Sequence, residues 1–514
     1  MSRLPRRAFL RRSLAAAGGA ITGPAIVRAQ GRRPEIPYGV SAGDVARGRA
    51  IVWSRADRPA RMVVEWDTTD AFANARRVTG PAATAATGLT ARVDLTGLPP
   101  GQRIAYRVRF EDIADARNVS EPALASFRTA PAGRGDLLLA WSADTAGQGW
   151  GINREWGGMR LFETMRQARP DVFVHCGDTI YADQPILAEV KLDDGSVWRN
   201  VVTPAKSKVA ETLDEFRGNY LYNLLDDNAR RFNADVAQVI LWDDHEVRDN
   251  WYPQEVLDDA RYTERRVSVL AARARQAFLE HQPIRLAADE PTRIYRSLAC
   301  GPSLEVFALD LRSERGPNSP NRQSQPGSDT ALLGAVQVRW LEHALRASRA
   351  TWKVIACDMP LGLVVTDGPT DFEAVANGES GPPLGRELEV AGVLRSIREH
   401  DVRNVVWITG DVHYAAAHHY DPARARFKDF KPFWEFVAGP LNAGTFGPGR
   451  LDDTFGPEVR FLGIPPGMKP NRPPSAGFQF FGTLRVAGRT DVMTVGLHDL
   501  TGKAVYTLDL EPER

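Results

Sequence analysis

The stretch HCGDTIYADQ, residues 175–184, sets the pattern from which the fold can be read. It completes an apolar run, places Gly177-Asp178 at the end of that run, and adds Tyr181 three residues later. Taken alone, Asp178 could cap a turn and Tyr181 could pack in a core. Both side chains could instead offer oxygen ligands to one metal ion. The remainder of the chain favours the second interpretation.

The same pattern, an apolar run that ends in aspartate, occurs six times. The runs are LLLAWSAD (137–144), VFVHCGD (172–178), VILWDD (239–244), VFALD (306–310), VIACD (354–358) and VVWITGD (405–411). Amphipathic stretches between some of them predict helices, so the sequence indicates an α/β fold with strands buried on both faces. Ligands bind at the carboxyl ends of such strands. Carboxylates crowded at one sheet edge repel each other, and a bound cation relieves that repulsion.

Residues 30–130 follow a different pattern, with apolar and polar residues alternating in short runs such as 104–110. This period of two is typical of half-buried strands. We predict a small N-terminal β-sandwich of the fibronectin type III kind over 30–130, and a second domain over 131–514. A final hairpin is expected over 493–510. The polar loops 316–329 and 366–385 are long enough to border a site.

Residues 1–29 have the character of an export signal, with arginines before a weakly apolar, Ala- and Gly-rich middle. Arg6-Arg7 followed by Ala-Phe-Leu indicates the twin-arginine type, although an ordinary secretory signal is the alternative. The segment holds six arginines and no acids, so its removal changes the formal charge from +1 to −5. We therefore expect a partner in the twin-arginine export machinery and a periplasmic or extracellular location.

The composition argues against several classes of protein. No basic stripe indicates a nucleic-acid surface or binding to an anionic membrane, and no later apolar run is long enough for a transmembrane segment. Three cysteines, Cys176, Cys300 and Cys357, are too few for a disulfide framework. At 43% hydrophobic and 25% charged residues, the chain is expected to be globular.

Four stretches, taken in order, resemble the signature of the calcineurin-like metallophosphoesterases. They are SADTAGQGWG (142–151), GDTIYAD (177–183), WDDHEVRDNW (242–251) and GDVHYAA (410–416). The tyrosine in the second stretch resembles that of purple acid phosphatases. The whole set, with the N-terminal β region and the arginine-rich signal, is most similar to the alkaline phosphatase D-like family. The resemblance implies a four-layer αββα sandwich.

The resemblance also implies a set of metal ligands. Asp144 matches the ligand on the first strand, Asp178 the carboxylate that bridges two metals, and Tyr181 the phenolate that binds a ferric ion. The remaining ligands implied by the match are Asp244, Asp411 and His413. Asp244 stands where the signature has asparagine and Asp411 where it has histidine. Some family members carry a cysteine on the first strand, where this chain has Ser142-Ala143-Asp144.

Two further residues are candidates for the reaction itself. His245 matches the histidine placed beside the leaving-group oxygen. Arg312, with Arg315, follows a strand and could bind phosphate oxygens through its forked donors, although a surface ion pair is the simpler interpretation. Adjacent Asp243 and Asp244 should point to opposite sides of their strand, and we expect Asp244 to face the metal.

Carboxylate and phenolate oxygens are hard ligands, suited to Fe³⁺ and to Ca²⁺, Mg²⁺ or Mn²⁺ rather than to a thiolate zinc site. The expected cofactors are Fe³⁺ with one or two Ca²⁺, or another divalent metal such as Mg²⁺, Mn²⁺ or Zn²⁺. The expected activity is hydrolysis of phosphomonoesters, phosphodiesters or both by metal-activated hydroxide. Two alternatives stay open: a phospholipase D-like or teichoic-acid phosphodiesterase, and a metal-stabilised envelope binding protein without turnover.

Overall fold

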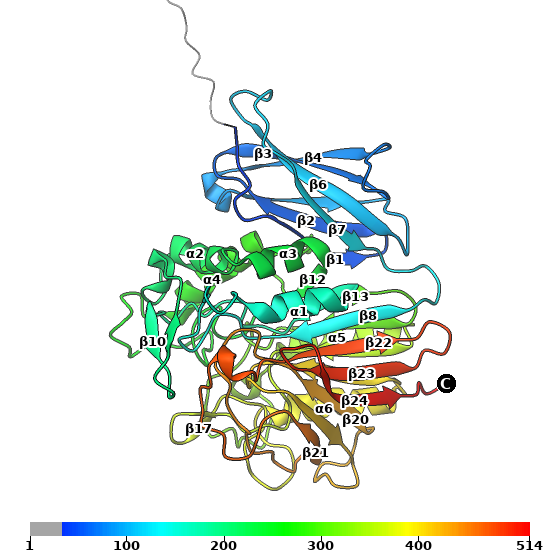
Figure 1. The fold of residues 1–514 in the computed structure, drawn as a ribbon. Coiled ribbons are helices and arrows are strands. Elements are labelled where there is room, and N and C mark those ends of the chain that lie inside the picture. The colour runs from blue at the N-terminus through cyan, green and yellow to red at the C-terminus, as the bar shows by residue number, and fades with distance from the viewer. Residues whose placement is uncertain (1–32) are drawn as a thin grey trace, which may run out of the picture. The chain divides into compact units, whose positions relative to one another are not determined.

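Residues 33–514 are described by the structure, a computed structural model, and the predicted signal at 1–29 lies outside this range. Two large sheets dominate these residues (Figure 1). The first has nine strands, in spatial order β24 (Ala504–Leu510), β23 (Met493–His498), β22 (Phe481–Val486), β8 (Leu137–Ser142), β9 (Val172–His175), β12 (Ala237–Ile240), β1 (Val40–Ala46), β2 (Arg49–Arg55) and β5 (Thr90–Leu95). Strands β8, β9 and β12 are parallel, whereas β22, β23 and β24 form an antiparallel edge that includes the predicted final hairpin.

The second sheet has seven strands. In spatial order they are β13 (Arg296–Ala299), β14 (Leu304–Ala308), β15 (Trp352–Ala356), β18 (Val405–Thr409), β20 (Phe433–Val437), β19 (Ala416–Tyr420) and β21 (Pro457–Leu462). The four strands β14, β15, β18 and β20 run parallel. All six predicted apolar runs are therefore strands, and the α/β class is confirmed.

One hydrophobic core lies between the two sheets. Leu139 and Trp141 of the first sheet belong to the same buried cluster as Val354 and Ile408 of the second. The alternate residue Ile355 belongs to another cluster, which includes side chains of two helices. Because successive strand residues point to opposite faces, each parallel strand is buried on both sides, as its unbroken apolar sequence predicts.

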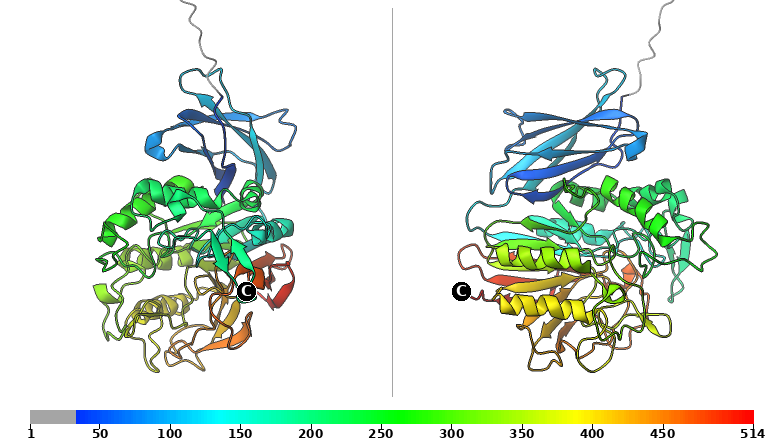
Figure 2. Two further views of the ribbon diagram at one scale, coloured as in Figure 1. Left: turned by 60° about the vertical axis from the view of Figure 1, so that its left-hand side comes forward. Right: turned by 180° about the vertical axis from the view of Figure 1, so that it is seen from behind.

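Helices cover the outer faces of the sheets. They are α1 (Arg160–Ala168), α2 (Leu213–Asn223), α3 (Asp227–Asp235), α4 (Val267–His281), α5 (Gly334–Ala347) and α6 (Glu387–Glu399). Helices α1 and α3 share a core with strand β9, and α5 and α6 share one with β14, β15 and β18. Figure 2 shows α5 and α6 side by side in its right-hand view, in yellow-green and yellow. Short 3₁₀ turns occur at Ala85–Thr87, Pro204–Lys206, Ser328–Thr330 and Pro474–Ala476.

The N-terminal region is built from strands, as its alternating sequence predicts. Its second sheet has the order β4 (Arg76–Ala83), β3 (Ala60–Asp67), β6 (Arg103–Asp112) and β7 (Ala123–Arg128), and it packs on β1, β2 and β5. Ile104, Tyr106 and Val108 of β6 are fully buried in this contact. Strand β1 continues the central sheet through its pairing of Gly43 with Gln238 of β12. The boundary at residue 130 stays a prediction.

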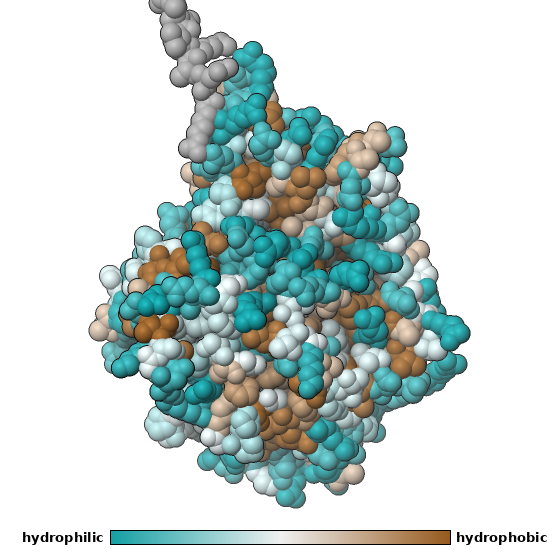
Figure 3. All heavy atoms as spheres, in the orientation of Figure 1, coloured by the Kyte–Doolittle hydropathy of each residue, from teal (hydrophilic) through white to brown (hydrophobic). Residues whose placement is uncertain are grey.

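Smaller features complete the described chain. Two short hairpins, β10 (Glu189–Lys191) with β11 (Val197–Arg199) and β16 (Thr366–Asp367) with β17 (Asp371–Phe372), lie outside the large sheets. The three cysteines are buried and free. Within residues 33–514, the helices are too short or too polar to span a membrane. On the face drawn in Figure 3, hydrophobic residues form small separate groups among hydrophilic ones.

Candidate functional site

Acidic residues from both sheets converge just beyond the carboxyl ends of the parallel strands. Asp144 follows β8, Asp178 follows β9, Asp244 follows β12, and Asp411 and His413 follow β18. Their side chains form three groups of possible metal ligands, with all ligand atoms of a group within 4.8 Å of one another. The groups are Asp144, Asp178 and His413; Asp178, Asp244 and His245; and Asp243, Asp244 and Asp411. Asp178 and Asp244 each belong to two of the three groups, and a carboxylate that bridges two ions requires such a shared position.

The backbone at these positions adopts an unusual conformation. Asp144, Asp178, Asp411 and His413 have φ angles of 66°, 54°, 67° and 62°. This left-handed region is uncommon for residues other than glycine, and such strain clusters at functional sites. Each left-handed residue turns the chain sharply within three or four residues of the end of a strand. Four predicted ligands therefore lie on tight turns that bring them together.

The carboxylate of Asp144 gives the clearest sign of a cation. The residue is fully buried, and among the described residues neither of its oxygens meets a hydrogen-bond partner. Burial raises the pKa of Asp144 well above its usual range, and burial does the same to Asp178. A buried carboxylate without a counter-charge is strongly unfavourable. The oxygen atoms of Asp144 therefore fit a bound metal ion.

The side chains of Tyr181 and His413 contact each other at this site. The hydroxyl of Tyr181 lies 3.0 Å from Nε2 of His413, and both side chains are buried. Nδ1 of His413 lies 2.6 Å from the carbonyl oxygen of Gly444, which assigns the ring proton to Nδ1 and leaves Nε2 free to bind a metal. Burial lowers the pKa of His413 to about 4, so the ring stays neutral. A Cβ atom at Gly147 would lie 2.4 Å from the Tyr181 ring, so the ring needs glycine there.

His245 is held by carboxylates on both ring nitrogens. Its Nδ1 lies 2.8 Å from Oδ1 of Asp183, and its Nε2 lies 3.5 Å from Oδ1 of Asp249. Burial lowers the pKa of His245, but the carboxylates of Asp183 and Asp244 outweigh burial and raise it well above the usual range. The ring also stacks on Tyr181, with centroids 4.3 Å apart. A protonated imidazole is thus presented beside the predicted ligands.

The neighbours Asp243 and Asp244 differ in their contacts, although both lie in one ligand group with Asp411. Asp244 accepts hydrogen bonds from the backbone amides of His245 at 2.7 Å and Asn250 at 2.6 Å. Its pKa is lowered, because nearby His245 and Arg312 outweigh the effect of burial, so this carboxylate remains ionised. Asp243 instead accepts a hydrogen bond of 2.7 Å from Nε of Arg312. Asp244 is thus the better placed of the two to bind a metal.

Arg312 does not face the cavity described below. Its side chain is fully buried, and its guanidinium contacts the carboxylates of Asp243, Asp358 and Glu373. Arg315, also fully buried, donates a hydrogen bond of 2.9 Å to the same Glu373. These carboxylates occupy several of the guanidinium donors, and Nη2 of Arg312 and Nε of Arg315 are buried without a hydrogen-bond partner among the described residues. The structure therefore favours a structural role for both arginines over the predicted contact with phosphate, and also over an exposed ion pair.

Glu246 was not among the predicted residues, yet it organises the site. Its carboxylate accepts hydrogen bonds from the backbone amides of Asp178 at 3.1 Å, Thr179 at 2.6 Å and Asp243 at 2.6 Å. It thereby ties the turn after β9 to the turn after β12. Its position next to His245 was visible in the sequence, but the direction of its side chain was not. Asp183, inside the quoted GDTIYAD, was likewise overlooked.

A cavity of about 370 Å³ opens over the predicted ligands. It is lined by the segments 363–366 and 446–449 and by five polar residues, Asp178, Asp244, His245, Asp411 and His413. The predicted border loop 366–385 contributes one residue to the lining, Thr366. The predicted loop 316–329 contributes none.

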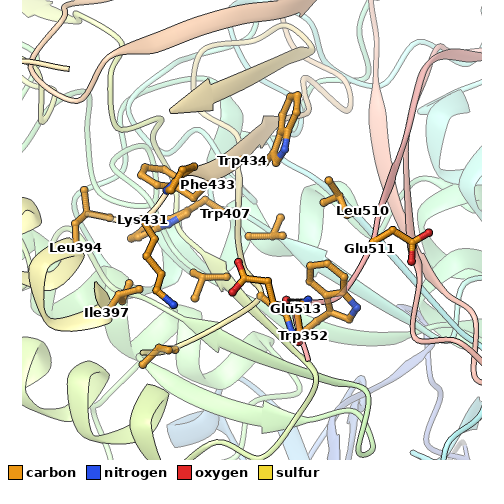
Figure 4. Close-up of a pocket in the computed structure, with 15 residues that line it drawn as sticks. Trp352, Leu394, Ile397, Trp407, Lys431, Phe433, Trp434, Leu510, Glu511 and Glu513 are labelled. Atoms are coloured by element: carbon orange, nitrogen blue, oxygen red, sulfur yellow. Dashed lines mark hydrogen bonds between the residues drawn. The ribbon is translucent and has the colours of Figure 1, made fainter. Parts of the chain in front are cut away.

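A second cavity of about 140 Å³ lies in the second sheet, at the amino ends of β15, β18 and β20 (Figure 4). It is lined by Trp352, Trp407 and Trp434, which stand at or near the starts of β15, β18 and β20. Its lining is largely aromatic and aliphatic, and it contains none of the predicted ligands. The chemistry thus belongs to the carboxyl-end cavity.

The donors present fit hard metal ions. Carboxylates from Asp144, Asp178 and Asp244, the phenol of Tyr181 and the imidazole of His413 provide four hard oxygen-bearing groups and one nitrogen. Burial raises the pKa of Tyr181 well above its usual range, so a phenolate here needs a cation beside it. Sulfur takes no part in the three groups.

Comparisons with known proteins identify the family of this chain. A model of the PhoD-like phosphatase family matches residues 139–497, and a model of the N-terminal domain of PhoD-like phosphatases matches residues 21–131. Alkaline phosphatase D of Bacillus subtilis (strain 168) is 27% identical over 440 residues, which cover 81% of this chain and 71% of that protein.

Two solved structures share the fold. The structure of PhoD matches with a TM-score of 0.67 and 18% identity, over 94% of this chain and 93% of that one. The purple acid phosphatase of yellow lupin (Lupinus luteus) seeds matches with a TM-score of 0.56 and 11% identity, over 93% and 74%. The mixed α/β fold is therefore of the kind found in these phosphatases. With the first family model spanning well over half of its residues, the chain belongs to the PhoD-like phosphatase family.

Proposed function

We propose that this protein is an exported, metal-dependent phosphoesterase that hydrolyses phosphomonoesters, phosphodiesters or both. The observation that carries the proposal is the buried Asp144, whose two oxygens lack partners and which lies in one ligand group with Asp178 and His413. The relative named alkaline phosphatase D supports the choice of reaction. The arginine-rich residues 1–29 support export, and the helix, sheet, sheet and helix clusters support a four-layer sandwich.

Metal binding would involve residues from both sheets. Asp144, Asp178, Tyr181 and His413 would hold one ion, which we propose is Fe³⁺ because phenolate is among the donors. We propose that a second ion, such as Ca²⁺ or another divalent metal, would be held by Asp244 with Asp178 on one side and Asp411 on the other, since Asp244 shares one ligand group with each of them. When bound, such ions supply hydroxide at neutral pH and neutralise charge on the phosphoryl oxygens.

His245 would transfer the proton, two carboxylates would hold its ring, and Arg312 would bind a neighbouring carboxylate. His245 carries its proton beside the cavity, where it can be donated to the leaving oxygen. Asp183 fixes the ring through Nδ1, so that Nε2 is the donor. Asp249, 3.5 Å from Nε2, is close enough to stabilise the protonated ring. Arg312 would act indirectly, by pairing with Asp243, whose carboxylate lies in one group with Asp244 and Asp411.

Hydrolysis of an aryl phosphate and of an aryl phosphodiester by the purified, exported protein tests this proposal. Activity should disappear when a chelator removes the metal and should return when metal is restored. If the metal-loaded protein turns over neither ester, the chain is a metal-stabilised binding protein, and the enzymatic proposal is overturned.

A further inference from the structure

A charged pocket of about 420 Å³ lies next to the cavity of the site. Its walls are the β10–β11 hairpin and the segment 469–476, and its floor is Trp150. Strand β10 is labelled in Figure 1, near the orange segment that contains residues 469–476. None of the ligand groups described above contributes to the pocket.

The pocket and the cavity share a wall. Gln148 lines the cavity, and its carbonyl oxygen accepts a hydrogen bond of 3.2 Å from Nδ2 of Asn471, which lines the pocket. Oδ1 of Asn471 accepts a hydrogen bond of 2.7 Å from Nε1 of Trp150. Trp150 packs edge-on against Trp198, with ring centroids 5.9 Å apart. The floor and the shared wall are thus fixed by specific contacts.

A second connection between the pocket and the cavity runs through the segment 444–446, which ends at the cavity lining. The backbone of Arg472 pairs with Thr445 through two hydrogen bonds of 3.0 Å. Gly444, one residue earlier, accepts the hydrogen bond from His413, and Phe446, one residue later, lines the cavity. A substrate that extends from the cavity past Gln148 would therefore enter this pocket.

The pocket lining carries three cationic side chains, Lys191, Lys469 and Arg472, and two carboxylates, Asp193 and Asp194, which leaves a net charge of +1. Oδ1 of Asp193 lies 2.7 Å from Nζ of Lys469, and its Oδ2 lies 3.3 Å from Nη1 of Arg472. Lys191 adds a third positive charge to the lining. The side chains of Lys469 and Arg472 are 66% and 33% exposed, so both can exchange Asp193 for another anion. Asp194 is already engaged by the backbone amide and hydroxyl of Ser196.

We propose that this pocket is a specificity subsite for esters whose alcohol part carries a second anionic group, such as the next phosphate of a phosphodiester chain. Lys469 and Arg472 bind that group in place of Asp193, while the ester to be cleaved lies over the predicted metal ligands. The inference rests on the proposed phosphoesterase function and deepens it.

Competition experiments on the metal-loaded, full-chain protein test the subsite, with an aryl phosphate as the reporter substrate. The competitors are α,ω-alkanediol bisphosphates of increasing length and the alkyl monophosphates of the same lengths. At the length that reaches the pocket, the bisphosphate should inhibit roughly three- to tenfold better than its monophosphate, since each exposed charge contact contributes modestly. An ω-carboxyalkyl phosphate series shows whether a carboxylate can replace the second phosphate.

Substitutions in the pocket then test whether the stronger inhibition by the bisphosphate arises there. Lys469→Gln combined with Arg472→Gln should abolish the advantage of the bisphosphate and leave kcat for the aryl phosphate unchanged. Asp193→Asn, which removes the competing carboxylate, should increase the advantage about twofold or more. Arg199→Gln, which removes an exposed pair with Glu155 and Glu189 outside the pocket lining, is the matched control and should change neither quantity.

Two results would overturn the subsite. In the first, the bisphosphate inhibits no better than the monophosphate at any length. In the second, its stronger inhibition survives in the double variant. Failure of the proposed function looks different, because the reporter ester would then not be hydrolysed at all. In that case calorimetric titration with the same bisphosphates still measures binding to the pocket.

Discussion

Two groups of buried carboxylates lie side by side near the strand ends, and they are neutralised in different ways. Asp243, Asp358 and Glu373 surround the guanidinium of Arg312, which balances much of their charge. Asp144 and Asp178 are equally buried, yet Asp144 meets no partner among the described residues. The difference separates acids that share a buried arginine from Asp144, neither of whose oxygens has a hydrogen-bond partner among the described residues. Aspartates that look alike in sequence are thus distinguished by what surrounds them.

The largest effect is expected from removal of Asp178, one of the two carboxylates that are shared by two ligand groups. Asp178→Asn should lower kcat/KM roughly 10⁴-fold, because it weakens the binding of both ions and their stabilisation of charge in the transition state. Kinetics and elemental analysis of the same sample measure the effect. Asp310→Asn is the matched control, since Asp310 also follows a strand but caps the amides of Arg312 and Ser313. Comparable losses of activity and metal in both variants would contradict the assignment.

Removal of the arginine should disturb stability rather than metal binding. Arg312→Met leaves the buried Asp243 and Asp358 without their counter-charge, and leaves Glu373 with Arg315 alone, so it should lower the free energy of unfolding by about 3–5 kcal/mol. Denaturant titration measures the change. Arg266→Met, which breaks an exposed pair with Glu264, should change it by less than about 1 kcal/mol. A stable Arg312→Met protein that has lost phosphate affinity would instead restore the catalytic role predicted from the sequence.

His245 tests the step that distinguishes an enzyme from a binding protein. His245→Gln should lower kcat about 10²- to 10³-fold for esters with poor leaving groups, and less for aryl esters, which leave without a proton. Stopped assays with a series of alcohols of increasing pKa give this dependence. Metal content should stay unchanged. An equal loss for all leaving groups would mean that His245 positions other groups and donates no proton.

Glu387 shows a third way in which a buried acid is neutralised, because it holds a proton. Its substitution is expected to have the smallest effect on the protein. Burial and the neighbouring Asp452 carboxylate raise the pKa of Glu387 from 4.5 to about 9. The proton held by native Glu387 stabilises the fold fully below pH 4.5, and this contribution is lost as the pH rises towards 9. Glu387→Gln stays neutral, so its stability relative to the parent should rise by about 1–3 kcal/mol between pH 5 and pH 9. A difference that is independent of pH would contradict this linkage.

The fold was largely readable because its signals are local. Continuous apolar runs that end in aspartate predict buried parallel strands, and all six runs are strands in the structure. Pairing between distant segments was not readable, and so the continuation of the central sheet into β1 through Gly43 and Gln238 was not foreseen. Such contacts depend on tertiary packing, which leaves no periodic trace in either segment.

The site residues could be predicted from the sequence where they lie within the four quoted motifs. The structure brings together Asp144, Asp178, Tyr181 and His413 from three separate stretches. Glu246 was missed because a carboxylate that binds backbone amides has no sequence pattern of its own. Arg312 was misplaced for a related reason: a strand-end arginine has the same sequence context whether it faces a cavity or a buried acid.

The central claim is that the buried acids around Tyr181 hold metal, and elemental analysis tests it most directly. The exported protein and its Tyr181→Phe variant are purified in parallel, and iron and divalent metals are counted per chain. The account predicts about one iron per chain in the parent and a marked loss of iron in the variant, because the phenolate favours Fe³⁺. A parent protein without stoichiometric metal would contradict the metal centre. Equal iron in both proteins would show that Tyr181 only packs against His245 and His413.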